Sequence, residues 1–367
     1  MPSIEQLFEA VLKKGKDLGA SDMHLCAGSP FRLRVHGRVV TLSGAPPLTT
    51  KDTEQIAGKI LLAAKRVTPE DLEGKLSGLT DEDCSYSLDG TSRYRVNMCS
   101  QRGSIALVLR AIPFAIPSFE DLSLPPVLTE IACEERGLVL VTGITGSGKS
   151  TTLAAIVNYI NKCRGGKIIT IEDPIEYLYR DEKSSIMQRE VGSDTVSFAK
   201  ALRAALRQDP DVILVGEMRD QETIDIALKA AETGHLVLST LHTTDAPKTI
   251  LRMIGVFDLS EQATIRLRLS ETLKAVISQR LLPRKDENGR TAALEIMRAT
   301  LSIRECIESP EKLDNIKDLM SRGAEQYGMQ TFDMHLSQLY REGVLAFETA
   351  RAAATSPADF ERNIQFD

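Results

Sequence analysis

The pattern of hydrophobic and polar positions changes about a third of the way along the chain. In Phe31–Val40 and again in Arg93–Ile112, apolar and polar residues alternate, which predicts antiparallel strands with one buried face. Later apolar residues come in unbroken runs, as in Leu138–Thr142 and Val212–Val215. Such runs are typical of parallel strands that are covered on both faces. The chain is therefore expected to contain two folding units of different architecture.

The first unit is predicted to be a small α+β domain over residues 1–112. It opens with a helix, because Ser3 and Gln6 have the spacing of a capping box and apolar residues recur on one helical face from Ile4 to Leu12. Thr68-Pro69-Glu70 predicts a second helix start, with proline at the first helical position. Helices are thus expected between the two pairs of strands.

Residues 113–126 are predicted to be a linker, because the prolines there forbid a continuous helix or a central strand. Residues 127–299 are predicted to form an α/β core with a parallel sheet, and residues 300–367 a helical C-terminal region. The predicted core strands are Leu138–Thr142, Lys167–Ile171, Val212–Val215 and Leu236–Ser239, and the predicted core helices are Lys149–Asn161, Phe198–Arg207 and Gln221–Thr233.

The composition of the chain bears on which partners it binds and on where in the cell it works. A length of 367 residues suits two domains, and a net charge of −6 disfavours nucleic acid as the partner. None of the six cysteines has C-x-x-C spacing, so neither a zinc site nor a redox dithiol is predicted. The chain has neither a signal-peptide pattern nor a stretch approaching the ~20 apolar residues that span a bilayer. A cytoplasmic protein is therefore expected.

The segment Gly143–Ser150 has the pattern G-x-x-x-x-G-K-[ST] between a predicted strand and a predicted helix, which is the context of a phosphate-binding loop. Glycines allow backbone N–H groups to surround the phosphates of ATP, and the helix N-terminus adds partial positive charge. Lys149 is expected to reach the β- and γ-phosphates, and the Ser150 hydroxyl to bind Mg²⁺. The predicted ATP-binding residues of the loop are Gly143, Thr145, Gly146, Ser147, Gly148, Lys149, Ser150 and Thr151.

Polar side chains follow three further apolar strands, at the ends where ligands gather in parallel sheets. Glu172 follows the second strand, Glu217 the third and His242 the fourth. A phosphate-binding loop needs such groups to hold metal, orient water and sense the γ-phosphate. Asp173 fits a turn before Pro174 as well as it fits catalysis, because aspartate favours turns.

At these positions the chain resembles the secretion-ATPase superfamily, and within it the type IV pilus retraction ATPases, over essentially its whole length. Gly143–Thr152 is similar to that family's Walker A motif, and Thr170–Tyr177 to its Asp box. Arg207–Asp220 is similar to its atypical Walker B motif, and Gly234–Thr243 to its His box. Within that last segment, His235 is as compatible with a structural role as with a functional one.

The resemblance implies a homohexamer whose subunits have a PAS-like α+β N-terminal domain and a RecA-like P-loop ATPase domain with a helical C-terminal region. It implies that ATP lies between the two domains and that Glu172 activates water while Glu217 acts on the metal side, although an exchange of these two roles stays open. The arginines that it implies for the ATP site are Arg95, Arg110, Arg207 and Arg219.

Two segments depart from the family's pattern. Thr244 stands where the family usually has asparagine in the His box, and Ser302–Glu308 keeps only part of the family's retraction motif. The resemblance implies a pilus retraction motor at the cytoplasmic face of the inner membrane, held there by a membrane platform protein. The departures also fit an accessory paralogue of that motor. A secretion or DNA-translocating ATPase, and a scaffold that binds nucleotide without hydrolysis, also stay open.

Overall fold

The computed structural model describes residues 3–35, 37–42, 44, 46–88, 92–112 and 115–366, and the chain divides into two compact units. The N-terminal unit contains Met1–Ala115 and takes in two later segments, Asp173–Leu178 and Glu190–Val196. The second unit contains the rest. Pro113 of the predicted linker and His36 of the first predicted strand pair lie outside the described residues. As boundaries of domains, the four predicted ranges remain a prediction.

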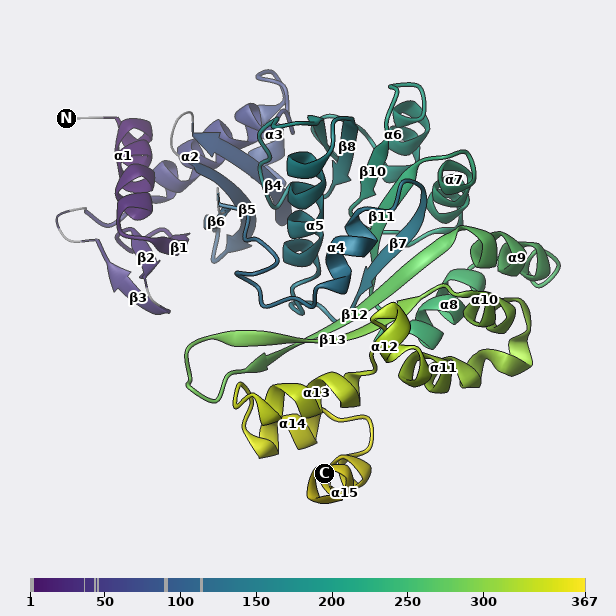
Figure 1. Cartoon of the computed structure of the whole chain (residues 1–367). Coiled ribbons are helices and arrows are strands. Elements are labelled where there is room, and N and C mark those ends of the chain that lie inside the picture. The colour runs from purple at the N-terminus through teal and green to yellow at the C-terminus, as the bar shows by residue number, and fades with distance from the viewer. Residues whose placement is uncertain are drawn as a thin grey trace. The chain divides into compact units, whose positions relative to one another are not determined.

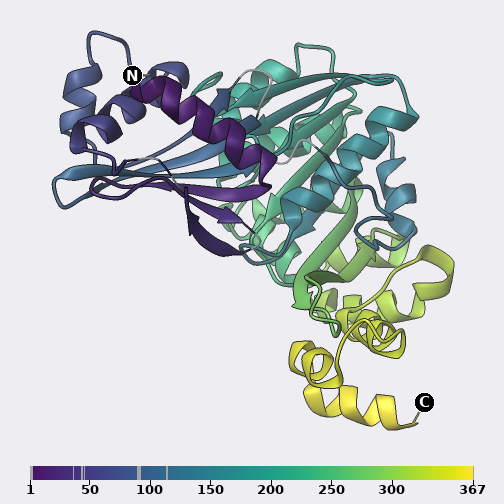
Figure 2. The ribbon, with the colours of Figure 1, turned by 90° about the vertical axis from the view of Figure 1, so that its left-hand side faces the viewer.

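The N-terminal unit is a six-stranded sheet with helices on one face, and Figure 2 shows the first helix running along that face. The strand order is β3-β2-β1-β6-β5-β4, and the five strand pairs are antiparallel. Its elements are α1 Ile4–Asp17, β1 Ala20–Leu25, β2 Arg32–Val35, β3 Arg38–Thr41, α2 Thr50–Ala63, α3 Leu72–Ser77, β4 Asp81–Leu88, β5 Ser92–Gln101 and β6 Ser104–Ile112.

Side chains from α1 and α2 form the core of this unit with alternate residues of the strands. Phe8 and Leu12 of α1 are fully buried, as are Tyr94 and Leu109 of the sheet. The predicted capping box at the start of α1 is confirmed, since Ser3 and Gln6 exchange hydrogen bonds. The predicted helix start at Thr68-Pro69-Glu70 is wrong. These residues form a turn in which the Thr68 hydroxyl donates to Asp71, and α3 begins after it.

The second unit is built on a seven-stranded sheet of order β13-β12-β7-β11-β10-β8-β9 (Figure 1). Five strands, β8, β10, β11, β7 and β12, are parallel, and β13 is antiparallel to β12. Its elements as far as β13 are α4 Val127–Ala132, β7 Gly137–Thr142, α5 Lys149–Cys163, β8 Lys167–Glu172, β9 Ser185–Glu190, α6 Phe198–Ala205, β10 Val212–Val215, α7 Gln221–Glu232, β11 Leu236–Leu241, α8 Ala246–Ile254, α9 Gln262–Thr272, β12 Leu273–Pro283 and β13 Arg290–Arg298.

The predicted strands and helices of this unit are confirmed, with ends that differ by two residues at most. Every residue of β7, β10 and β11 is buried, because helices cover both faces of the sheet. Three strands, β9, β12 and β13, were not predicted. The helix α9 ends at Thr272 and β12 begins at Leu273, so neither glycine nor proline marks that boundary. β9 has alternating exposure and many polar residues, which hide it from a search for apolar runs.

The predicted helical C-terminal region is present and has a core of its own. Phe332, Leu336 and Phe360 are almost fully buried there and pack with Ala293 of β13. In Figure 1 the helices labelled α13 and α14 lie beside the long β12–β13 pair, and α15 lies beyond them. The helices are α10 Leu301–Glu308, a 3₁₀ helix Pro310–Asn315, α11 Ile316–Arg322, α12 Ala324–Tyr327, α13 Phe332–Arg341, α14 Phe347–Ala353 and α15 Pro357–Phe366.

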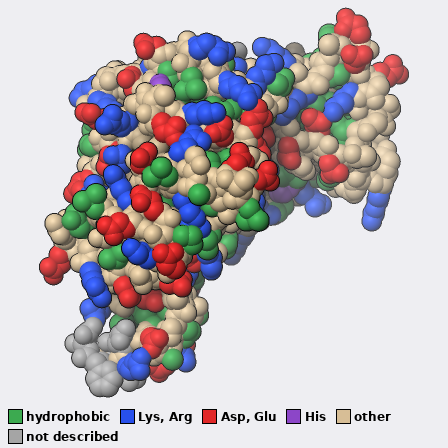
Figure 3. All heavy atoms as spheres, turned by 90° about the vertical axis from the view of Figure 1, so that its right-hand side faces the viewer, with side chains coloured by type: hydrophobic (Ala, Val, Ile, Leu, Met, Phe, Trp, Pro, Cys, Tyr) green, Lys and Arg blue, Asp and Glu red, His purple; other side chains and the backbone are tan. Residues whose placement is uncertain are grey.

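The surface in Figure 3 carries lysine and arginine side chains interspersed with aspartate and glutamate, as expected for a chain with 45 basic and 51 acidic residues. Among the described helices, none is both long and apolar enough to cross a bilayer.

Candidate nucleotide site

The predicted phosphate loop runs from the end of β7 into α5, as its sequence context requires. Gly143, Gly146 and Gly148 have φ angles of 149°, 79° and 88°, values that residues with a Cβ rarely adopt. A Cβ on Gly143 would lie 2.5 Å from the carbonyl oxygen of Gln279, whereas a Cβ on Gly146 would meet nothing within 4 Å. The loop is thus closely packed on one side and open on the other, which is the shape of a phosphate cradle.

Lys149 begins α5 and is almost completely buried beneath the loop. Its ammonium group donates to the carbonyl oxygens of Gly143 at 2.9 Å and Ile144 at 3.1 Å. These bonds hold the charge at the base of the cradle, where an anion bound to the loop N–H groups would meet it.

Gln279 supports the loop from β12 and was not predicted. Its amide nitrogen donates to the carbonyl oxygen of Ser147 at 2.7 Å, and its amide oxygen accepts from the Thr152 hydroxyl at 2.8 Å. Only 3% of Gln279 is exposed. The sequence offers one sign of Gln279, a polar residue that follows a short apolar run. The pattern does not reveal that this run belongs to a strand of the sheet.

The sheet brings the predicted positions together at one edge. β7, β11, β10 and β8 are consecutive parallel neighbours, so the residues that follow them emerge at the same edge. These are the loop from Gly143, then His242, Glu217 and Glu172. The hydroxyl of Thr240 donates to the carbonyl oxygen of Gly216 at 2.7 Å, which fixes the turn before Glu217 against β11.

Glu217 lies between a basic and an aromatic partner. Its carboxylate accepts from Arg219 at 2.7 Å, and its other oxygen is 3.3 Å from Nε2 of His242. Burial by itself would raise the pKa of Glu217, but the hydrogen bond from Arg219 and the proximity of His242 outweigh burial and lower that pKa. Glu217 is therefore a carboxylate at neutral pH, the form that a metal-side role needs.

Glu172 ends β8 and is 8% exposed. One of its oxygens, Oε1, accepts from the hydroxyl of Thr170 at 2.6 Å and from the side-chain amide of Gln188 at 3.3 Å. Gln188 lies on the unpredicted strand β9. A buried carboxyl at a strand end that accepts from Thr170 and Gln188 suits a group that must keep one orientation.

The segment after His242 is clamped by hydrogen bonds to α8 and β13. The hydroxyls of Thr243 and Thr249 are 2.6 Å apart, and the Thr249 hydroxyl donates to the carbonyl oxygen of Asp245. The backbone N–H of Ala246 donates to the carboxyl of Glu295 at 2.8 Å. Glu295 is 2% exposed and was not predicted, because its partner is a backbone group 49 residues away.

Burial, together with the smaller effect of the nearby Asp245, raises the pKa of Glu295 from 4.5 to about 7, although the Ala246 N–H, Lys317 and Arg280 act in the other direction. A carboxyl whose pKa is raised by folding stabilises the protein below its unfolded pKa, and this contribution is lost as the pH rises through about 7. Glu295→Gln should therefore become relatively more stable than wild type between roughly pH 5 and 8, by on the order of 3 kcal/mol. Urea unfolding of both proteins across this range measures the difference, with the exposed Glu325→Gln as control. An equal pH dependence of wild type and Glu295→Gln would contradict the assignment.

A hollow of about 430 Å³ adjoins the loop within the second unit. The loop and α5 contribute Gly148, Thr151 and Thr152, and β12 contributes Gln279 and Leu281. A turn before α4, around Leu122 to Leu124, and the β12–β13 connection complete the lining. Its mixed apolar and polar wall, continuous with the phosphate cradle, has the character of a ligand pocket. Part of the predicted linker thus lines this hollow.

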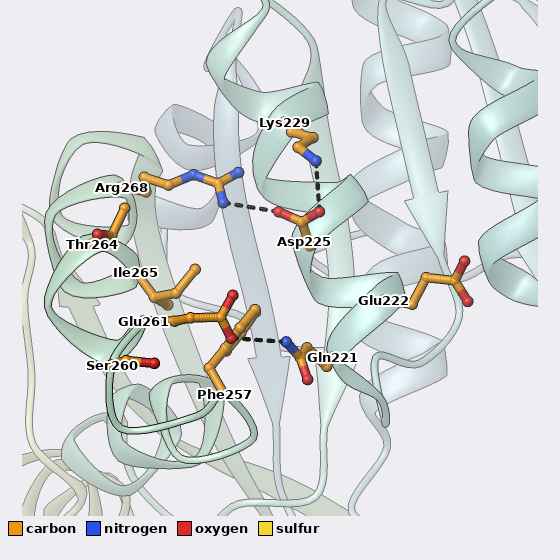
Figure 4. A pocket seen from close by; sticks show the side chains of 10 residues that line it. All are labelled: Gln221, Glu222, Asp225, Lys229, Phe257, Ser260, Glu261, Thr264, Ile265 and Arg268. Atoms are coloured by element: carbon orange, nitrogen blue, oxygen red, sulfur yellow. Dashed lines mark hydrogen bonds and ion pairs between the residues drawn. The ribbon is translucent and has the colours of Figure 1, made fainter.

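A second cavity, of about 650 Å³, lies between α7 and α9 (Figure 4). Asp225 pairs there with Lys229 and Arg268, and Gln221 donates to Glu261. None of its lining residues comes from the phosphate loop or from the three strand-end positions. The hollow beside the phosphate loop is therefore the better candidate for the nucleotide site, because its lining includes residues of that loop.

The four predicted arginines fall in different units. Arg95 and Arg110 are cross-strand neighbours on β5 and β6 of the N-terminal unit, and Arg110 pairs with Asp22 at 2.9 Å. Arg207 and Arg219 belong to the second unit, and Arg219 contacts a predicted site residue, Glu217. Both arginine pairs remain predictions as ATP ligands.

The sequence allowed two interpretations each for Asp173 and His235, and the structure shows the surroundings of both residues. Asp173 lies in a bend, with a cis peptide bond to Pro174, and this is the turn position that its sequence allowed. His235 lies at the start of β11, the opposite end of the strand from His242. Its Nδ1 is 2.9 Å from the carbonyl oxygen of Ala230, and its own carbonyl oxygen accepts from the N–H of Gly137 at 3.0 Å.

Known proteins are similar to this chain over nearly its whole length. The family described as type II/IV secretion system protein matches residues 100–356. The type IV pilus retraction ATPase PilT of Pseudomonas aeruginosa is 46% identical over 342 residues, 93% of this chain and 96% of that protein. The type IV pilus ATPase PilU of the same organism is 40% identical over 360 residues, 98% of this chain and 91% of that protein. A crystal structure of the pilus retraction motor PilT with bound ADP has a TM-score of 0.86 and 45% identity, and covers 96% of this chain and 98% of that one.

Proposed function

Because the chain belongs to the type II/IV secretion system protein family and is an ATP-hydrolysing enzyme, we propose that it is a motor that powers type IV pilus retraction. The observation that carries the proposal is the 46% identity to a pilus retraction ATPase over 93% of the chain. The convergence of the loop, Glu172, Glu217 and His242 on one sheet edge supports it. The predicted fold class, two domains of which the second is RecA-like, is confirmed by the similarity to the PilT structure.

In this proposal the triphosphate of ATP lies in the cradle over Lys149, and adenosine takes the adjoining hollow beside Leu281. Residues Gly143 and Thr145 to Thr151 surround the phosphates. The hydroxyl of Ser150 and the carboxylate of Glu217 are hard oxygen donors of the kind that Mg²⁺ prefers, so the donor set fits this ion. Mg²⁺ bound there would neutralise charge that develops on the phosphates.

The remaining chemistry is assigned to the protein's side chains. The buried carboxylate of Glu172 orients and deprotonates the attacking water, and Thr170 and Gln188 keep its orientation. His242 donates a hydrogen bond to the γ-phosphate from its place beside Glu217. Arginines supply positive charge in the transition state, which is the role proposed for Arg95, Arg110, Arg207 and Arg219.

We place the motor as a homohexamer at the cytoplasmic face of the inner membrane, where a platform protein of the pilus machinery holds it. The resemblance to the secretion ATPases, which implies a ring of six subunits, supports this assembly. In this assembly the platform protein provides the membrane association.

Deletion of the gene tests the proposed function. The expected result is an excess of surface pili that do not retract, together with loss of twitching motility. Wild-type protein should restore retraction, and Lys149→Ala should not. Unchanged retraction in the deletion strain would instead indicate an accessory role like that suggested by the 40% identity to PilU.

A further inference from the structure

We propose that Glu190 is a positioning residue for ATP hydrolysis, which holds the segment after β8 and thereby the carboxylate of Glu172. This inference rests on the proposed role of Glu172 as the base. Glu190 is the last residue of β9 and is 1% exposed. In the sequence it is one acidic residue among many, and no motif singles it out.

The carboxylate of Glu190 accepts hydrogen bonds from several separate parts of the chain. Its Oε2 accepts from the guanidinium of Arg93 at 2.7 Å and from the backbone N–H of Ile175 at 3.0 Å. Its Oε1 accepts from the hydroxyls of Ser85 at 2.6 Å and Ser193 at 3.2 Å. All five residues belong to the N-terminal unit. One buried group thus joins β4, β5, the segment after β8 and the end of β9.

The charge of Glu190 is stable in this position. Burial alone would raise its pKa, but the hydrogen bonds from Ser85, the Ile175 N–H and Arg93 together lower it. A buried carboxylate with this many donors exchanges its partners only at a large free-energy cost, since each donor would be left unsatisfied. The contacts therefore persist as a fixed anchor.

The anchored segment is the one that follows the proposed base. The chain leaves the second unit at the peptide bond after Glu172, and Asp173–Leu178 belongs to the N-terminal unit. Ile175, three residues beyond Glu172, is 5% exposed and has its N–H fixed by Glu190. The backbone that carries the proposed base is therefore restrained immediately after the active residue.

The same strand restrains this region a second time. Gln188 lies two residues before Glu190, so the two side chains emerge on the same face of β9. The amide nitrogen of Gln188 donates to Glu172, and its amide oxygen accepts from the backbone N–H of Tyr179 at 3.0 Å. β9 thus holds the connection from Glu172 to Tyr179 at both ends through Gln188 and in the middle through Glu190.

The segment beyond Glu190 is also closely packed. Gly192 has a φ angle of 90°, and the guanidinium of Arg66 lies against it, 1.8 Å from where a Cβ would be. The backbone N–H of Glu190 donates to Asp194 at 2.9 Å. Arg93 is two residues from Arg95 on β5, so within the N-terminal unit Glu190 also holds the strand that carries a proposed transition-state arginine.

Two substitutions separate position from charge. Glu190→Asp keeps the charge but shortens the side chain by one methylene, so it cannot reach all four donors. Glu190→Gln keeps the length, and its amide can accept from Arg93 and Ile175 while donating to the serine hydroxyls. We expect Glu190→Asp to lower kcat about 10- to 100-fold at little changed KM for ATP, because small misplacements of a catalytic group are costly. Glu190→Gln should stay close to wild type.

Three further measurements show whether the effect passes through Glu172. In a Glu172→Gln background, Glu190→Asp should cause no additional loss of kcat, because residues that act as a unit are not additive. Amide exchange at Ile175 should become faster in Glu190→Asp. The matched control is Glu82→Asp on β4, whose carboxylate pairs with Lys75 at 2.6 Å and which should leave kcat unchanged.

The outcomes separate this inference from the proposed function. Wild-type protein without ATP turnover overturns the proposed function, and this inference with it. Turnover in wild type with an unchanged kcat in Glu190→Asp overturns the inference alone. A larger loss in Glu190→Gln than in Glu190→Asp also overturns it, because charge rather than position would then be the cause.

Discussion

Lys149→Ala is expected to abolish measurable ATP turnover and to weaken nucleotide binding. The ammonium group is held at the base of the phosphate loop by two carbonyl oxygens, and the substitution removes this positive charge from the cradle. Loss of one preorganised donor to a developing anion lowers kcat by roughly 10²- to 10³-fold. Steady-state phosphate release and equilibrium binding of a fluorescent ATP analogue measure the two effects.

Lys162→Ala is the matched control for this substitution. Lys162 lies in the last turn of the same helix, α5, and is exposed. It should retain wild-type turnover, and both variants should keep the wild-type circular dichroism spectrum. Full activity of Lys149→Ala would remove the phosphate loop from the mechanism.

Glu172→Gln is expected to bind ATP like wild type and to lose hydrolysis. The single oxygen Oε1 accepts from both Thr170 and Gln188, so an amide oxygen can retain both contacts while the basic carboxylate disappears. General base catalysis contributes roughly 10²- to 10⁴-fold, and the loss of kcat should lie in that range. Single-turnover hydrolysis and ATP affinity, measured on the same preparation, separate chemistry from binding.

Glu217→Gln distinguishes the two carboxylates, whose roles the residue pattern left exchangeable. If Glu217 acts on the metal side, its substitution should raise the Mg²⁺ concentration needed for half-maximal turnover, and Glu172→Gln should not. The exposed Glu182→Gln serves as control for both. A shift in Mg²⁺ dependence only in Glu172→Gln would show that the roles are exchanged.

Residues whose partners are close in sequence could be recognised from the sequence alone. The phosphate loop is contained in eight consecutive residues, and its glycines and lysine act through backbone geometry and one charge. The strands β7, β8, β10 and β11 are recognisable from unbroken apolar runs, because a strand buried on both faces tolerates few polar residues. Polar residues directly after these runs then identify Glu172, Glu217 and His242.

Residues whose partners are distant could be assigned only from the tertiary structure. Gln279 supports the loop from 132 residues away, and Glu190 accepts from Ser85 across 105 residues. The neighbouring residues in the sequence do not distinguish these side chains from solvent-exposed ones. Their burial and their hydrogen-bond partners are set by the order of strands in the sheet. The sequence also does not reveal that Asp173–Leu178 and Glu190–Val196 pack as part of the N-terminal unit, because their partners there are distant along the chain.

The amino-acid sequence by itself therefore determined the class of the second unit, the phosphate-loop motif and the family, since each depends on contiguous residues. The tertiary structure decided which side chains support that site. It made β12 the neighbour of β7 and made β9 the strand that restrains Glu172. The physical reason is that a hydrogen bond between buried polar groups requires both partners at one point in space, and a chain without its fold does not bring them there.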